Sequence, residues 1–257
     1  MPSRKLLVLA GAVSALGLGL LFWAYPSAVP DAAHDARVEA SETRWPVGEQ
    51  RNYSVRLDSR VRFDQQDIMV VTVAGTLDMT RVSSEQLELA AALEVSSVSL
   101  GVQASPEEEA AVRRGLGEPF SIRFGPGGRV EEIGFPPVDQ PEAARALARG
   151  LLRTLAAALQ VASPPSGDQQ EWIAEERDPV GVVRVRYQRR DHDLAKRKLE
   201  YVRVTSKGPL VDARTEFASS LADLTFDGRG TSPETLVGVQ QREETTVRSE
   251  GPLPTLG

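Results

Sequence analysis

Three long runs of alternating apolar and polar residues constrain the fold of this chain most. The runs cover 51–63, 69–79 and 87–102. Alternation with period two predicts strands that bury one face. Gly75 predicts a bend, and a change of phase at Ser96–Ser97 predicts a β-bulge. Because a usual strand has about 5 to 6 residues, runs of this length predict a large, curved antiparallel sheet or an open β-barrel.

Later segments add hairpins and strands. Residues 118–135 alternate on both sides of a turn at Gly125–Gly128. A second hairpin is predicted at 171–190, turning on Asp178–Gly181. Further strands are predicted near 199–204, 211–217 and 234–249. The sequence therefore predicts a mainly β protein of the α+β class, with about nine to eleven antiparallel strands.

Two helices are predicted among these strands. Ser105 and Glu108 form a capping box, and Pro106 takes the first helical position of a short helix that Gly115 ends. A long helix is predicted from Asp139 to about Val161. Its leucines recur every four residues, so this helix should lie against the sheet, which would wrap around it. These leucines are Leu147, Leu151, Leu155 and Leu159.

The N-terminus predicts export. Residues 6–23 carry no charge and follow Arg4 and Lys5. An uncharged helix of this length spans about 27 Å, close to the hydrocarbon core of a membrane. We favour a signal-anchor in residues 1–28 that faces the periplasm from the inner membrane, with a cleaved signal peptide and secretion as the alternative. Residues 29–44 predict a tether.

Composition narrows the function further. The net charge of −6 argues against nucleic-acid binding, and the absence of cysteine excludes disulfides and thiolate metal sites. His192 in "DHD", residues 191–193, is predicted to lie in a solvated turn. The "GPGG" turn at 125–128 lacks the ending of a phosphate-binding loop. We therefore predict no cofactor, no metal and no enzyme activity.

The order of motifs resembles one family of lipid carriers. Four motifs carry the resemblance: Pro119-Phe120, Gly128-Arg129-Val130, Arg149-Gly150-Leu151-Leu152, and Leu159-Gln160 followed by Gly181 and Tyr187. Residues 45–59 also resemble the first strand of the family. This pattern is similar to the N-terminal β-barrel module of the large lipid transfer proteins, the vitellogenin, apolipoprotein B and microsomal triglyceride transfer protein family. The resemblance implies a barrel domain over 45–250, followed by a tail at 251–257. The family's cysteine falls on Val183, so its disulfide is absent.

Two groups of side chains are candidate binding residues. The long helix and the inner face of the sheet form either a plain core or an apolar ligand pocket. The pocket residues would be Tyr53, Val55, Val71, Val73, Leu89, Phe120, Ile122, Leu151 and Leu155. A stripe of arginines on the opposite side of the helix is either an exposed face or a surface that pairs with acids of this domain or a partner. It comprises Arg145, Arg149 and Arg153.

The sequence predicts a non-enzymatic envelope protein. Its domain would bind a protein partner or an apolar ligand such as a lipid. The alternative is a periplasmic lipid or lipoprotein chaperone similar to the LolA and LolB half-barrels, which also place helices in a curved sheet. A hydrolase or metalloenzyme is the third class, and a cleft with strongly perturbed titratable groups would favour it.

Overall fold

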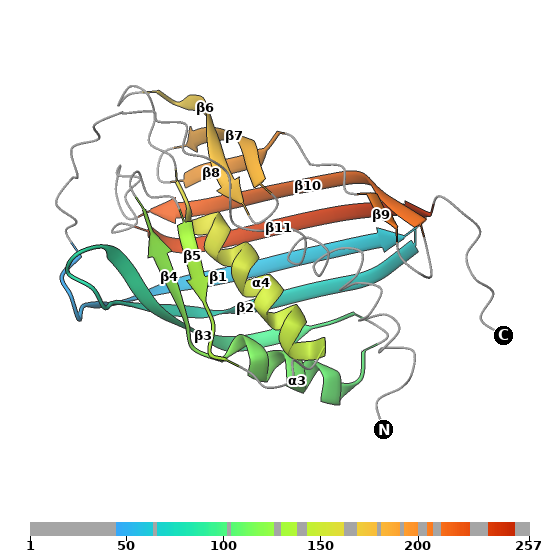
Figure 1. Ribbon diagram of the computed structural model, residues 1–257, viewed down its shortest axis with the longest axis horizontal. Helices are drawn as coiled ribbons and strands as arrows, with labels where there is room; N and C mark the ends of the chain where they lie inside the picture. Colours follow the sequence, from blue (N-terminus) through green and yellow to red (C-terminus); the bar gives the residue numbers. More distant parts are fainter. Residues whose placement is uncertain are drawn as a thin grey trace.

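The computed structural model describes residues 45–63, 66–101, 104–125, 130–137, 143–161, 169–178, 181–190, 193–199, 205–207, 212–226 and 236–249. These residues form one mixed sheet with two helices (Figure 1). The ten strands of its main path follow the order β5-β4-β3-β2-β1-β11-β10-β8-β7-β6, and β9 pairs with β10 beside this path. The prediction of a mainly β protein with a large sheet is confirmed.

The sheet consists of two arms that are joined in the middle. In the first arm each strand pairs with its neighbour in sequence. Its strands are β1 (Gln50–Phe63), β2 (Gln66–Arg81), β3 (Leu87–Ser99), β4 (Phe120–Phe124) and β5 (Val130–Gly134). The second arm has the strands β6 (Glu171–Asp178), β7 (Gly181–Arg190), β8 (Asp193–Lys198), β9 (Thr205–Lys207), β10 (Asp212–Phe226) and β11 (Leu236–Ser249).

The two arms meet through a parallel pair, which corrects the prediction of an antiparallel sheet. β1 and β11 run in the same direction, with Ser54 opposite Gly238 and Phe63 opposite Val247. The pairs within each arm are antiparallel. Parallel strands require a long connection, and here that connection is the rest of the domain. Alternation within a strand carries no information about such a distant partner.

The long helix crosses the inner face of the sheet because it connects its two edges. Among the described strands, β5 pairs only with β4 and β6 only with β7, so the sheet is not closed into a barrel. α4 (Ala143–Leu159) lies between these two strands in the sequence. Figure 1 shows it running diagonally over β1 and β2, while the strands of both arms turn away from the direction of β1. The predicted cap at Asp139 lies outside the described residues.

The core is a continuous layer between the sheet and the helices. It draws Leu77 from the first arm, Leu224 from the second and Val112 from α3 (Pro106–Leu116). On α4, Leu151, Leu152, Leu155 and Leu159 are 0 to 4 % exposed. Burying one such side chain fully contributes about 1.5–3 kcal/mol. The predicted leucine stripe therefore anchors α4 to the sheet.

Two local predictions are confirmed in detail. Ser105 caps α3, accepting a hydrogen bond from the backbone N–H of Glu108, whose carboxylate accepts one from the backbone N–H of Ser105 in return. The phase change in β3 is a bulge, because the register between β2 and β3 shifts between Ala74 and Gly75 and skips Ser96. A Cβ at Gly75 would lie 2.3 Å from the carbonyl oxygen of Glu94, so glycine is required there.

The predicted membrane segment at 6–23 and the tether at 29–44 lie outside the described residues. Within the part of the chain that the structure describes, no helix is long and apolar enough to cross a membrane. The described part of the domain begins at Trp45, which is 1 % exposed and donates from its indole N–H to the carbonyl of Glu49 at 2.9 Å.

Candidate functional site

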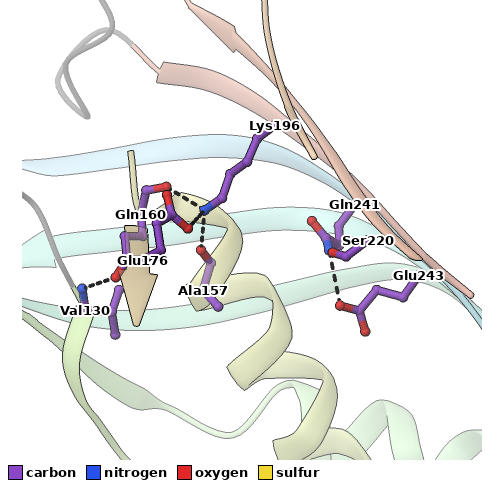
Figure 2. Close-up of polar contacts among 8 residues, drawn as sticks. All are labelled: Val130, Ala157, Gln160, Glu176, Lys196, Ser220, Gln241 and Glu243. Atoms are coloured by element: carbon purple, nitrogen blue, oxygen red, sulfur yellow. Dashed lines mark hydrogen bonds and ion pairs between the residues drawn. The ribbon is translucent and has the colours of Figure 1, made fainter. Parts of the chain in front are cut away.

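The C-terminal end of α4 is held by a lysine from the sheet. Lys196 of β8 donates from Nζ to the carbonyl of Ala157 at 2.9 Å and to the carbonyl of Gln160 at 2.7 Å (Figure 2). The last carbonyls of a helix have no partner within it and carry partial negative charge. The ammonium group therefore satisfies both the hydrogen bonds and the dipole of the helix end.

The same lysine forms a buried ion pair with the edge strand β6. Its Nζ lies 2.7 Å from Oε2 of Glu176, and both side chains are 4 % exposed. An ammonium group has three N–H donors, and its contacts with Ala157, Gln160 and Glu176 number three. The lysine thus links α4 to one edge of the sheet.

The side chain of Gln160 reaches the other edge. Its Oε1 accepts a hydrogen bond from the backbone N–H of Val130, the first residue of β5, at 2.8 Å. We call these five residues the seam cluster: Val130, Ala157, Gln160, Glu176 and Lys196. Because β5 and β6 are the two edges of the open sheet, the seam cluster bridges the gap between them through side chains.

The two buried charges of the seam cluster stabilise the fold less than an apolar pair would. Removing two charges from water costs several kcal/mol per ion, and their mutual attraction offsets this only when every remaining polar atom is bonded. Oε1 of Glu176 is buried and has no hydrogen-bond partner among the described residues. A well-packed apolar pair would hold the same position at lower cost. The cluster is therefore better suited to fixing one arrangement of α4 than to maximising stability.

The nine predicted pocket residues all belong to the core between the sheet and the helices, seven of them on strands and two, Leu151 and Leu155, on α4 itself. Their exposed fractions run from 0 % for Tyr53, Val71 and Ile122 to 4 % for Phe120. In this arrangement the helices and neighbouring side chains cover the strand residues. A ligand could contact them only if α4 moved away from the sheet.

The arginine stripe pairs largely within the domain. Arg145 and Arg149 lie 2.5 and 3.5 Å from the carboxylate of Glu118, and Arg149 also donates to the carbonyl of Pro136 at 2.6 Å. The guanidinium groups of Arg149 and Arg153 lie 5.2 and 5.0 Å from the ring centre of Phe135. Burial and the neighbouring Arg149 lower the pKa of Arg153. The stripe therefore fastens α4 to the segments around β4 and β5.

Other positions offer little for chemistry. Among the described residues, no group of three His, Cys, Asp or Glu side chains could hold a metal ion. His192 lies outside them. A depression of about 580 Å³ opens on the outer face of the sheet, lined by Ser54, Arg56, Asp223, Val237 and neighbouring residues. None of the predicted pocket residues borders it.

Comparison with known proteins identifies no relative. No protein-family model matches the sequence, and no curated protein matches it. The resemblance to the lipid transfer proteins therefore rests on the short motifs alone and stays a prediction.

Sequence reasoning missed most of the seam cluster. Gln160 enters the sequence analysis only as part of a motif, and no strand is predicted where β8 lies. The strand predicted at 199–204 falls, beyond Leu199, outside the described residues. In β8 the inward positions are Leu194 and Lys196, so a lysine occupies a site where the alternation requires an apolar residue. Its partner Glu176 likewise follows Trp172 and Ala174 on the inner side of β6. A charged residue in phase with apolar ones was the available signal.

Proposed function

We propose that this domain binds an apolar ligand, such as a lipid acyl chain, on the inner face of its open sheet, with α4 as the element that covers the empty site. The observation that carries the proposal is the seam cluster. Among the described strands, β5 and β6 are the two edges of one sheet, and both are held to the end of α4 by side-chain contacts that take the place of a backbone ladder.

The apolar face under α4 supports this proposal. It is continuous across both arms, since the core includes inner residues of β1, β2, β3, β4, β7, β8 and β10. The buried positions of α4 include small residues such as Ala156 and Ala158 as well as leucines. Small side chains interdigitate less deeply than large ones. Displacing such a helix uncovers a wide apolar surface that an acyl chain can cover again.

The proposed role is binding and release of a ligand, without a reaction on it. The proposal also keeps the predicted setting, in which residues 6–23 hold the domain at a membrane and so close to a source of lipid. Docking of a protein partner remains the competing function, and the dense packing of the nine predicted pocket residues favours it.

Lipid extraction of the purified chain, with mass spectrometry of the extract and of the native protein, tests the proposal. We expect bound acyl lipid in a fixed ratio to the protein. We also expect more bound lipid in the double variant Glu176→Leu/Lys196→Met, which removes both charges of the seam cluster. Arg197→Met, the next residue of β8 and on its exposed face, is the matched control and should bind as the original chain does. Absence of lipid from all three proteins would favour docking.

A further inference from the structure

Four polar side chains gather on the inner face, where alternation calls for apolar ones. Ser59 of β1 and Ser220 of β10 both lie opposite Glu243 of β11. Gln241 lies two residues before Glu243, opposite Leu57 and Ala222. Residues directly opposite one another in a sheet point to the same face. We call these four residues the inner polar row: Ser59, Ser220, Gln241 and Glu243.

Hydrogen bonds fix the orientation of Gln241 within this row. Its Nε2 donates to Oγ of Ser220 at 2.7 Å and to Oε1 of Glu243 at 3.4 Å (Figure 2). An ionised carboxylate only accepts hydrogen bonds, so the amide nitrogen has to face Glu243. The amide oxygen then points away from Glu243, as Figure 2 shows.

That oxygen has an unused bonding capacity. Oε1 of Gln241 is buried without a hydrogen-bond partner among the described residues, and the residue is 3 % exposed. Buried polar atoms are bonded in the large majority of cases, so each exception requires an explanation. The residues directly opposite Gln241 are Leu57 on β1 and Ala222 on β10, and their side chains have no donor to offer it.

We propose that the inner polar row binds the head group of the acyl ligand, and that this head group donates hydrogen bonds and carries no negative charge. Alcohols, monoacylglycerols and amines have this chemistry. Oε1 of Gln241 accepts the bond from the head group, and the two serine hydroxyls adapt as donors or acceptors. An ionised carboxylate or phosphate head group offers acceptors only and has no donor for the buried oxygen of Gln241, so fatty acids and phosphate esters are disfavoured. This inference rests on the proposed function, because the acyl chain occupies the adjacent apolar face.

Competition against a photoactivatable fatty alcohol tests the inference in the full-length chain in phosphatidylcholine nanodiscs. The readout is the labelling of peptides from residues 45–249, measured by mass spectrometry. The competitors share one acyl chain: monolaurin, methyl laurate and laurate. We expect monolaurin to compete about threefold to tenfold better than methyl laurate, the difference that one hydrogen bond to a neutral group makes. Laurate should be the weakest competitor.

Gln241→Leu should reduce the ratio between monolaurin and methyl laurate to about one while methyl laurate competes as before. Gln240→Leu is the matched control, since its side chain lies on the same strand but on the exposed outer face; it should keep the original ratio. Equal competition by all three ligands, or an unchanged ratio in Gln241→Leu, would overturn the inference and leave apolar binding intact. Labelling that no competitor reduces would overturn both.

Discussion

Tyr53 shows how strongly the fold alters the chemistry of a single residue. Its side chain is 0 % exposed, and its ring centre lies 6.4 Å from that of Trp45. Burial raises the pKa of Tyr53 from 10.0 to about 12, with Arg51 opposing the shift and Glu49 adding to it. The hydroxyl is therefore neutral in the folded domain at a pH where a tyrosine in the unfolded chain ionises.

This shift predicts a loss of stability in alkali. The folded pKa lies above the unfolded one, so the stabilisation is complete below pH 10.0 and is lost as the pH rises towards about 12. Each pKa unit corresponds to about 1.4 kcal/mol, which gives a loss of about 3 kcal/mol over this range. Urea unfolding at a series of pH values should show this loss in the original chain and a shallower decline in Tyr53→Phe. Parallel curves would contradict the assignment.

Lys196 and Glu176 offer a second test at the scale of single residues. Lys196→Met leaves the carboxylate of Glu176 buried without its cation, and we expect the free energy of unfolding to fall by about 3–5 kcal/mol. Glu176→Leu/Lys196→Met removes both charges and should recover most of that loss. Chemical denaturation of the two variants, with Arg197→Met on the exposed face of β8 as the control, measures the difference. A double variant no more stable than the single one would show that the pair itself stabilises the fold.

Among the elements, α3 and α4 depend on one close approach. A Cβ at Gly115 would lie 2.8 Å from the Cβ of Ala148, which is fully buried. Gly115→Val should therefore force the helices apart and lower the free energy of unfolding by about 1–3 kcal/mol. Adding Ala148→Gly should restore part of this loss.

Thermal or chemical unfolding of these variants measures the effect. Gly117→Val is the matched control, because a Cβ there would meet its nearest neighbour at 3.6 Å, an ordinary contact. If Gly115→Val and Gly117→Val lose the same stability, the general cost of a valine at the end of α3 explains the loss and the crossing does not.

Elements were predictable from the sequence where the local pattern was complete. Alternation placed β1, β2 and β3, and the capping box placed α3, because each signal lies within a few neighbouring residues. β8 was missed since Lys196 interrupts the apolar alternation, and its role depends on α4 and β6, which are distant in the sequence. The apolar face of the candidate site followed from periodicity. The seam and the inner polar row did not, because both depend on how separate strands align.

At the scale of the whole molecule, the seam predicts a local opening. In Glu176→Leu/Lys196→Met we expect faster hydrogen exchange in the last turn of α4 and at the amide of Val130, which Gln160 protects. Local opening proceeds from regions held by few contacts. Exchange in the central strands β1 and β11 should not change. Hydrogen–deuterium exchange with mass spectrometry measures both regions, and a uniform acceleration across the sheet would contradict a hinged α4.

The central pairing of the sheet was the largest feature beyond sequence reasoning. The predicted hairpins gave the pairs β4–β5 and β6–β7, whereas the parallel pair of β1 and β11 joins positions such as Val55 and Val239. Apolar alternation fixes which face a strand buries but leaves its partner open. The outcome is an open sheet with its edges at β5 and β6, and with β1 and β11, the first and last strands in the sequence, at its centre.

This arrangement has a consequence for synthesis on the ribosome. The first arm can pair strand by strand as it emerges, but β1 has to wait with one side uncovered until β11 has been made. During that time the backbone N–H and C=O groups of β1 that will later pair with β11 are available to any other extended chain. A nascent polypeptide of this design therefore depends on fast translation or a chaperone, and shortened versions that lack β11 should aggregate through β1.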